Sequence, residues 1–234
     1  MPGPPPPGIS PEVNDTSPDS PPLPEAPPDA ATPHEPILRI PPATGWLIAI
    51  NVAIHIARGF LPAAQDDVVV ERLAFNPAYL THYSDANSIA SLVTYQFLHG
   101  GWDHLIINMV SLLAFGAGIE RPLGKARFLF LYLLCGIAGA LFETAITPNV
   151  NDFLVGASAS ISGLFGALML LWGLHRRGKR PMGIVPMILL WIALFTVTGV
   201  IGLGSNGVPV AWLAHIGGFI AGVLLIRPLA RTLR

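Results

Sequence analysis

The chain has 234 residues, of which 52% are hydrophobic and only 12% are charged, and its mean hydropathy is +0.57. This composition excludes an ordinary soluble domain and predicts a polytopic, all-α membrane protein. The net charge of −1 hides a segregation of sign along the chain, so the total indicates little about partners, and we predict no nucleic-acid partner. The single cysteine, Cys135, excludes an intrachain disulfide and a cysteine metal site.

Residues 1–43 differ in composition from the rest of the chain. They contain 16 prolines and six acidic residues, and Arg39 is their only Lys or Arg. Such a segment cannot bury a core, so we predict a disordered, Pro-rich cytoplasmic tail with polyproline character. A PPxP-like stretch is typical of a ligand for a partner domain, but a solvated tail is the favoured interpretation. No basic segment precedes a short apolar core, so the first span should be an uncleaved signal anchor.

Six apolar segments of roughly 17 to 22 residues follow, each about long enough to cross a hydrocarbon layer ~30 Å thick. We therefore predict a six-helix transmembrane bundle in residues 44–229 and a short basic cytoplasmic C-terminus at 230–234. The predicted spans are residues 45–61, 101–118, 128–147, 157–173, 183–203 and 210–228.

The connecting segments differ in charge, and this difference predicts the orientation. Basic residues follow the second, fourth and sixth spans, whereas the opposite loops contain only Arg72, with Arg58 near the end of the first span. By the positive-inside rule, both termini are cytoplasmic. The basic residues are Arg121, Lys125, Arg127, Arg176, Arg177, Lys179, Arg180, Arg227, Arg231 and Arg234.

The loop at residues 62–100 is too long for a simple turn. It mixes apolar and polar residues, as in VVVERLAFNPAYL. This pattern predicts short interfacial helices on the outer leaflet rather than another crossing.

Three motifs carry polar side chains into the apolar spans, where such groups are costly and mark function. His104 and Asn108 lie four apart and so on one helical face, while Ser158 and His215 come from two other helices. A rise of 1.5 Å per residue puts all four near the middle or in the outer half of the membrane, as a shared site requires. The motifs are HGGWDHLIINM (99–109), VGASASISGLFGA (155–167) and AHIGGFIAG (214–222).

Small residues repeat every four positions in the fourth and sixth spans, and this repeat predicts close contact between the two helices. The contact would put Ser158 within reach of His215, where an imidazole can take the hydroxyl proton. The predicted ridges are Ser158, Ser162 and Gly166 on one helix and Ala214, Gly218 and Gly222 on the other.

These motifs resemble those of the rhomboid intramembrane serine proteases. The resemblance covers residues 44–229 and includes TYQFLHGGWDHLIINM, the GIERPLG turn, VGASASISG and AHIGGFIAG. It implies that Ser158 is the nucleophile of a GxSG element and that His215 is the general base of an AHxxGxxxG element. The remaining correspondences are His104 and Asn108 as oxyanion-stabilising donors, His99 as a structural histidine, and Gly156, Gly218 and Gly222 as supporting glycines.

The resemblance implies a Ser-His dyad that hydrolyses peptide bonds in or beside transmembrane segments near the outer membrane face. A histidine can activate a serine without a carboxylate if packing fixes its ring. Because the histidines have no clustered carboxylate or cysteine, we predict no metal and no cofactor. The expected partners are transmembrane protein substrates and the lipid bilayer, and the expected location is a bacterial plasma membrane.

The chain departs from the family pattern after the serine, where the usual glycine is Ala159. If that glycine serves only for close packing, one methyl group is tolerable. If it needs an unusual backbone angle, alanine is strained. The loop at 62–100 also lacks the Trp-Arg pair found in some members.

Several other polar residues receive structural interpretations. Ser160 is rotated by about 200° from Ser158 and should face away from His215. Ser162 is rotated by only about 40° but lies deeper, and we expect it to pack or to bond back to a carbonyl. Asn51, His55 and Arg58 form a stripe in which Arg58 snorkels to the surface. Asp103 should point away from His104, and Glu143 should cap a polar network rather than complete a triad.

Two other functions compete with the protease. A catalytically silent rhomboid-like protein would bind membrane clients, and only Ala159 favours it, because Ser158 and His215 are both present. A small proton-coupled transporter would also use intramembrane His and Asn, but no inverted repeat is evident.

Overall fold

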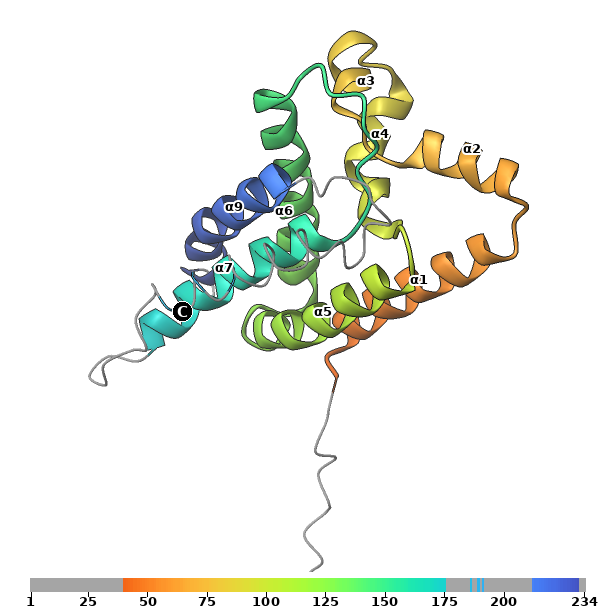
Figure 1. Cartoon of the computed structure of the whole chain (residues 1–234). Coiled ribbons are helices and arrows are strands. Elements are labelled where there is room, and N and C mark those ends of the chain that lie inside the picture. Colours follow the sequence, from red (N-terminus) through yellow and green to blue (C-terminus); the bar gives the residue numbers. More distant parts are fainter. Residues whose placement is uncertain (1–39, 176–185, 187–188, 190, 192–211, 232–234) are drawn as a thin grey trace, which may run out of the picture. The chain divides into compact units, whose positions relative to one another are not determined.

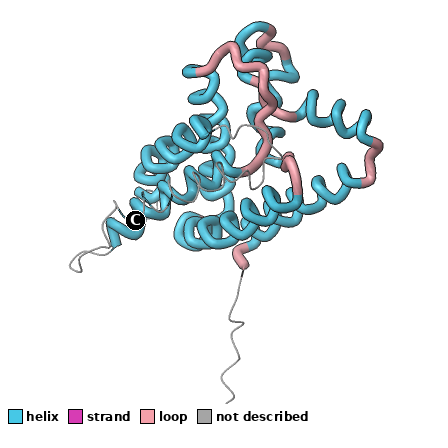
Figure 2. Tube along the Cα trace, in the orientation of Figure 1, coloured by secondary structure: helices cyan, strands magenta, loops and turns pink. Residues whose placement is uncertain are grey.

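The computed structural model describes residues 40–175, 186, 189, 191 and 212–231, which belong to one compact unit, Arg39–Arg234 (Figure 1). These residues form helices joined by loops, without a β-strand among them, and Phe75 and Leu154 make an isolated antiparallel bridge (Figure 2). The all-α prediction is confirmed for this part of the chain. The helices are α1 (Pro42–Gly59), α2 (Ala63–Leu73), α3 (Pro77–His82), α4 (Ala86–Thr94), the 3-10 helix η1 (Tyr95–Phe97), α5 (Trp102–Leu123), α6 (Lys125–Ile146), α7 (Ser158–His175) and α9 (Trp212–Arg231).

Three of these helices are long and apolar enough to cross a membrane: Trp102–Leu123, Lys125–Ile146 and Trp212–Ala230. α1 has 18 residues but carries Asn51, His55 and Arg58, and the side chains of α7 are described over Ser158–Leu171, an apolar stretch of 14 residues. The predicted span at 183–203 lies outside the described residues except for positions 186, 189 and 191. The chain is therefore an integral membrane protein, while the count of six spans stays a prediction.

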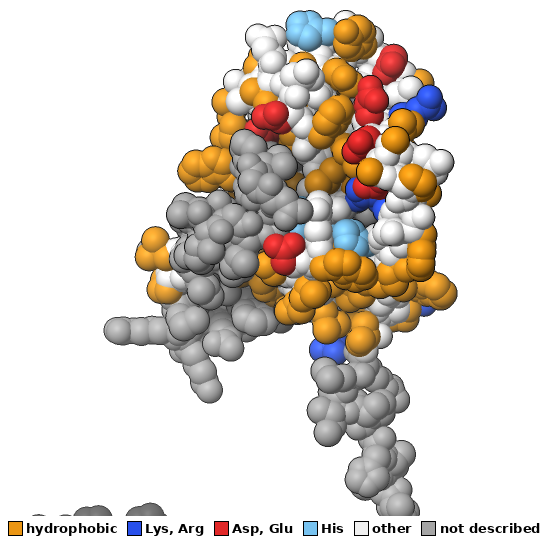
Figure 3. All heavy atoms as spheres, turned by 45° about the vertical axis from the view of Figure 1, so that its right-hand side comes forward, with side chains coloured by type: hydrophobic (Ala, Val, Ile, Leu, Met, Phe, Trp, Pro, Cys, Tyr) orange, Lys and Arg blue, Asp and Glu red, His pale blue; other side chains and the backbone are white. Residues whose placement is uncertain are grey.

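Apolar side chains are exposed along α5 at a helical spacing. Trp102, Ile106, Val110 and Leu113 are 36% to 63% exposed and lie on one face, because they are three or four residues apart. Figure 3 shows apolar side chains spread over the lower part of one face of the molecule and acidic side chains in its upper right part. A continuous apolar stripe of this kind suits contact with lipid rather than water.

The connection between α5 and α6 is much shorter than predicted. Residues 119–127 were expected to form a loop, but Gly124 alone separates the two helices. Gly124 has φ +78°, and its N–H donates to the carbonyl of Glu120 at 2.8 Å. A glycine ends a helix in this conformation without steric cost, so the helices continue up to it from both sides. Pro122 is tolerated within the last turn of α5.

The predicted short helices of the outer loop are present as α2, α3, α4 and η1. Two of them have side-chain N-caps, since Asn76 accepts the N–H of Tyr79 at 3.1 Å and Asp85 accepts the N–H of Ser88 at 2.7 Å. The bonds from Ser88 hold the pKa of the Asp85 carboxyl below its ordinary value. None of the residues of α2 is buried, which is the exposure that a surface helix would have.

The contacts between helices define their relative directions. α1 is antiparallel to α5, because Thr44 contacts Glu120 near one end and Arg58 bonds the carbonyl of His99 just before the other. α6 is antiparallel to α7, because Gly139 of α6 lies against Ala159, whereas Cys135, one turn earlier in α6, lies against Gly163, one turn later in α7. α7 and α9 run in the same direction, and Figure 1 shows them side by side. The fourth and sixth spans of the predicted topology also run in the same direction.

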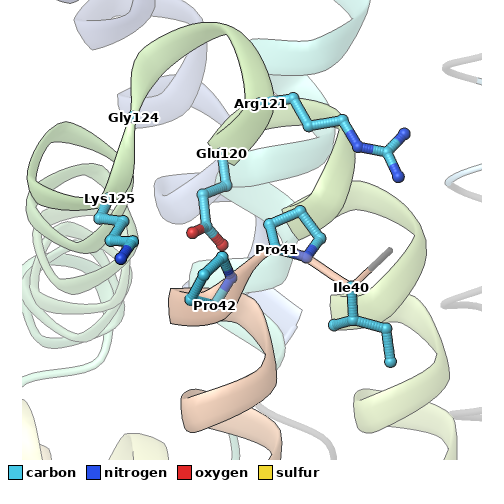
Figure 4. A pocket seen from close by; sticks show the side chains of 7 residues that line it. All are labelled: Ile40, Pro41, Pro42, Glu120, Arg121, Gly124 and Lys125. Atoms are coloured by element: carbon cyan, nitrogen blue, oxygen red, sulfur yellow. The ribbon is translucent and has the colours of Figure 1, made fainter. Parts of the chain in front are cut away.

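A buried carboxylate caps the first turn of α1 from another helix. α1 has no side-chain cap of its own, and Glu120 of α5, 3% exposed, supplies the acceptor. It accepts the N–H of Ala43 at 2.9 Å and the N–H and hydroxyl of Thr44 at 2.7 and 2.8 Å. Figure 4 shows Glu120 directed toward Pro42, whereas Arg121 points to the other side. The N–H groups of Ala43 and Thr44 at this helix start are thus satisfied although they are buried.

The pocket in Figure 4 lies beside this cap and is distinct from the polar motifs. Its volume is about 460 Å³, and it is lined by residues 40–42, 120–121 and 124–125. Since Glu120 is sixteen residues along α5 from His104, the two are about 24 Å apart. The pocket is therefore not where the predicted site residues meet.

Glu120→Ala should lower the free energy of unfolding by about 2–4 kcal/mol, because two buried N–H groups and one hydroxyl lose a charged acceptor. Glu120→Gln keeps one acceptor oxygen and should lose less. Thermal unfolding of the purified protein in detergent, with circular dichroism as the signal, measures both variants. An alanine variant as stable as the parent would contradict the capping role.

Candidate active site

Gly156 is the point at which three of the predicted site residues meet. Its φ is +122°, a conformation that favours glycine. A Cβ added to Gly156 would lie 2.9 Å from Cε1 and Nε2 of His104 and 3.7 Å from Oγ of Ser158. The imidazole of α5 and the hydroxyl of α7 therefore lie beside the same backbone position, and any side chain there would displace the imidazole.

The loop that leads into α7 is held by backbone hydrogen bonds. The N–H of Gly156 donates to the carbonyl of Tyr95 at 2.9 Å, and Phe75 and Leu154 exchange two bonds at 3.0 and 2.7 Å. Burial raises the pKa of Tyr95 above its ordinary value, so its hydroxyl stays protonated and donates to the carbonyl of Gly136 at 2.8 Å. The outer loop and α6 thereby fix where α7 begins.

Ser158 is the first residue of α7 and is half-buried. The carbonyl of Ala157 accepts the N–H of Ile161 at 3.0 Å, which starts the helical pattern. The N–H of Ser158 is therefore one of the first four, which have no acceptor within a helix. Both the hydroxyl and the N–H of this residue lie at a helix start, where partial positive charge favours an anion.

His104 presents one edge of its ring to this point. The N–H of Gly100 lies 3.5 Å from Nδ1 of His104, a long contact that suits the neutral tautomer with its ring proton on Nε2. Nε2 is one of the two ring atoms that face Gly156. A donor N–H is thus directed toward the region of the Ser158 hydroxyl.

Asn108 lies one turn after His104, as the spacing predicts, and is 4% exposed. Its Nδ2 donates to the carbonyl of His104 at 2.9 Å. A side-chain amide has two N–H groups, so this bond occupies one of them and the amide keeps a second donor.

His99 lies behind His104, with ring centroids 5.2 Å apart and planes at 67°. Burial lowers the pKa of His99 to about 3, so its ring is neutral at pH 7. Its carbonyl accepts Nη1 of Arg58 at 2.9 Å. This buried position supports the structural role expected for His99.

Arg58 differs from its predicted behaviour. It was expected to snorkel to the surface, but its guanidinium forms a two-pronged pair with Asp66 of α2, with N–O distances of 2.7 and 3.0 Å. The third bond, to His99, connects α1 and α2 to the start of α5. Sequence reasoning missed this pair because Asp66 lies in the outer loop, and the only available signal was an acidic residue eight positions after Arg58.

α7 and α9 approach each other through their backbones. A Cβ on Gly218 would overlap Ala159, and one on Gly222 would overlap Gly163. The glycines of the predicted α9 ridge therefore do lie against α7.

The α7 side of this contact differs from the prediction. Its ridge is Ala159, Gly163 and Gly166 rather than Ser158, Ser162 and Gly166, with Gly166 against Phe219. Residues one position apart are rotated by about 100°, so the two serines lie beside the contact and not in it. Backbones meet most closely where neither helix carries a bulky or polar side chain, and Ala159 and Gly163 meet that condition better than the serines.

His215 follows Ala214 in the first turn of α9 and is 4% exposed. Ala214 lies at the junction of three helices, since a Cβ on Gly139 would lie 2.5 Å from its carbonyl oxygen and 2.8 Å from Cβ of Ala159. The turn that carries His215 is therefore packed against the first turn of α7, which carries Ser158.

Ala159 is accommodated by packing. It is not among the described residues with positive φ, it lies in α7, and it is 2% exposed. Its methyl group faces Gly139, where a second Cβ would lie at 2.8 Å. The position therefore needs no unusual backbone angle, and of the two interpretations of the missing glycine the packing one holds.

The neighbouring serines are also placed. Ser160 is fully buried and donates to Oε1 of Gln96 at 2.8 Å, on another side of α7 from the α9 contact. Ser162 is fully buried as well, and of the two expectations the packing one holds, because its hydroxyl has no hydrogen-bond partner in the described part of the chain. Gln96 was not singled out from the sequence.

Glu143 was expected to cap a polar network, and in the structure its carboxylate caps the first turn of α9. Its Oε2 accepts the N–H of Ala214 at 2.8 Å. Among the described residues, no group of three or more His, Cys, Asp or Glu side chains could hold a metal ion.

Residues 86–232 match the Rhomboid domain family model, which is more than half of the chain, so the chain belongs to the rhomboid family. The rhomboid protein YdcA of Bacillus subtilis is 35% identical over 136 residues, 57% of this chain and 64% of that protein. Rhomboid protease GluP of the same species is 33% identical over 132 residues, 56% of this chain and 24% of that protein. Inactive RHOMBOID-like protein 8 of Arabidopsis thaliana is 31% identical over 160 residues, 64% of this chain and 42% of that protein.

The match spans less than two thirds of each of these relatives. Their names include both a protease and an inactive member. Family membership alone therefore leaves the activity of this chain to be argued from its residues.

Gly156→Ala should displace His104 and lower the reactivity of Ser158 toward a fluorophosphonate about tenfold or more, because small displacements of reacting groups strongly lower the reaction rate. Alanine is strained at φ +122°, and its Cβ would enter the space of the imidazole. Gly59→Ala is the control, since a Cβ there meets no atom within 4 Å. Gel-based labelling compares the two, and equal labelling rates would contradict the role given to Gly156.

Proposed function

We propose that this protein is an intramembrane serine endopeptidase in which Ser158 is the nucleophile and His215 is the general base. The observation that carries the proposal is the placement of the Ser158 hydroxyl and the His104 ring around Gly156, at the start of a helix in contact with α9. The chemistry of these groups, a hydroxyl beside an N–H donor at a helix start, is that of acyl transfer.

The directions of α7 and α9 support the pairing of Ser158 with His215. Ser158 comes one residue before a contact residue, Ala159, and His215 comes one residue after Ala214. Successive residues of a helix are rotated by about 100°. Because α7 and α9 are parallel and face each other, the residue before a contact residue on α7 and the residue after one on α9 point to the same side of the helix pair. The two groups then flank one edge of the helix pair.

The proposed reaction begins when Nε2 or Nδ1 of His215 takes the Ser158 proton and Oγ attacks a substrate carbonyl. The oxyanion receives hydrogen bonds from Nε2–H of His104, the second amide N–H of Asn108 and the N–H of Ser158. The protonated His215 then gives its proton to the leaving amine. Water, activated by His215, hydrolyses the acyl-enzyme and restores the serine.

A dyad rather than a triad is proposed. The Oε2 of Glu143 bonds the backbone N–H of Ala214, the residue directly before His215. Asp103 is exposed at the start of α5. Packing between α6, α7 and α9 would then orient the imidazole.

A catalytically silent member is the second candidate, and the similarity to Inactive RHOMBOID-like protein 8 is the observation that favours it. Against it stand the retained Ser158 and His215 and the packing of Ala159. Labelling by a fluorophosphonate separates the two, because only an activated serine reacts.

We further propose that both termini are cytoplasmic, that the membrane is a bacterial plasma membrane, and that residues 1–43, 44–229 and 230–234 are tail, catalytic domain and basic terminus. In this orientation the site lies in the outer half of the bilayer. Substrates would be transmembrane proteins cut near their outer end, where the helix must unwind. Mass-spectrometric mapping of product termini tests this, and cuts at the cytoplasmic boundary would contradict it.

Ser158→Ala should abolish the fluorophosphonate adduct and proteolysis, whereas Ser162→Ala should keep both. The reason is that Ser158 is half-buried beside His104, whereas Ser162 is fully buried in the helix core. Peptide mapping of the adduct locates the reactive serine. An adduct on Ser162, or an active Ser158→Ala protein, would overturn the assignment.

His104→Ala and Asn108→Ala should each lower kcat about 10²-fold or more, because oxyanion donors act mainly on the transition state. Fluorophosphonate labelling of the serine should be partly retained in both variants. His215→Ala should lose more of both the turnover and the labelling. Turnover of a single-span substrate reconstituted in lipid measures the effect. Full activity of both His104→Ala and Asn108→Ala would exclude an oxyanion-stabilising role for these two residues.

A further inference from the structure

Two buried glutamates use their carboxylates to cap the first turn of a helix other than their own. Glu120, near the end of α5, caps α1, and Glu143, near the end of α6, caps α9. Both are less than a tenth exposed. The chemistry is the same, but only α9 carries a residue of the proposed dyad.

The bond from Glu143 reaches the third residue of α9. Since α9 begins at Trp212, the N–H of Ala214 has no acceptor within the helix, and Oε2 of Glu143 accepts it at 2.8 Å. The hydroxyl of Thr147 donates to the carbonyl of Glu143 at 2.8 Å and lies 3.4 Å from its Oε1. A carboxylate at a helix start also interacts favourably with the helix dipole.

Further contacts from α6 surround the same turn. Gly139, four residues before Glu143 and on the same face, lies against the carbonyl of Ala214, and Phe142 lies against Gly217. The residue directly before His215 and the residue two positions after it thus both lie against α6. The contacts to Ala214 and Gly217 fix the position of His215 along the axis of α9 and its rotation about that axis.

We propose that Glu143 is a positioning residue, whose carboxylate holds the turn of α9 that carries His215 and thereby orients the imidazole toward Ser158. The inference rests on the proposed function. A carboxylate within an apolar layer is costly unless its oxygens are bonded, and here the bond goes to the residue directly before the base. Loss of this acceptor leaves a buried N–H unsatisfied and allows the turn to move.

The test compares Glu143→Ala, Glu143→Gln and the matched control Glu120→Ala in the full-length protein. The first measurement is the rate of fluorophosphonate labelling per folded molecule, with kcat and KM for a single-span substrate. Glu143→Ala should lower the labelling rate and kcat about tenfold or more with KM little changed, because a small displacement of the base acts on the chemical step. Glu143→Gln keeps an acceptor oxygen and should restore most of the rate. Glu120→Ala should unfold at a lower temperature yet label at the parental rate.

The second measurement is hydrogen exchange of the amides in residues 212–220, followed by mass spectrometry. Exchange should be faster in Glu143→Ala and unchanged in Glu143→Gln and Glu120→Ala. If the fluorophosphonate did not label the parent protein, the proposed function would be wrong. The exchange data would still decide whether Glu143 holds this turn of α9. The proposal would be overturned if Glu143→Ala labelled and exchanged at the parental rates. It would also be overturned if Glu120→Ala lost as much labelling as Glu143→Ala, or if Glu143→Gln labelled as slowly as Glu143→Ala.

Discussion

The backbone contact between α7 and α9 is the constraint on which the candidate site depends. Gly218 and Gly222 lie so close to Ala159 and Gly163 that a side chain on either glycine of α9 would overlap the backbone of α7. In a bilayer, lipid tails are as apolar as leucine, so helices associate by close packing rather than by hydrophobic exclusion. Small residues therefore do more than permit the contact. They set the distance and register at which a residue of one helix faces a residue of the other.

A second constraint comes from backbone groups at helix starts, which need acceptors where water is scarce. The protein meets this need from neighbouring elements. Glu120 serves α1, Glu143 serves α9, and the carbonyl of Tyr95 accepts the N–H of Gly156 just before α7. At the start of α7 the N–H of Ser158 has no acceptor within the helix, in keeping with an anion site there. The starts of α1 and α9 are capped by glutamates of neighbouring helices, whereas the start of α7, which is proposed to bind an oxyanion, presents the N–H of Ser158.

Sequence patterns predicted the long helices that the structure describes, the outer-loop helices, the α9 ridge and the placement of His104 near Ser158, because spacing on a helix determines which residues share a face. They failed where the answer depended on the partner helix. The α7 ridge was placed on Ser158 and Ser162, one residue away from Ala159 and Gly163, since small residues occur on both faces of that helix. The pairing of Arg58 with Asp66 and the length of the turn at Gly124 depend on tertiary contacts and on one backbone angle, and neither has a period in the sequence.

The departure of Ala159 from the usual glycine and the cap by Glu143 have a common physical origin. Gly139 of α6 has no side chain, and the space it leaves receives the methyl group of Ala159 on one side and the carbonyl of Ala214 on the other. The same absence of a side chain brings α6 close enough to α9 for Glu143, one turn further on, to reach the N–H of Ala214. The volume gained at position 159 is thus balanced at position 139, and the packing that tolerates alanine beside the serine is also the packing that holds the turn carrying His215. An alanine at this position is therefore no argument for a silent protein.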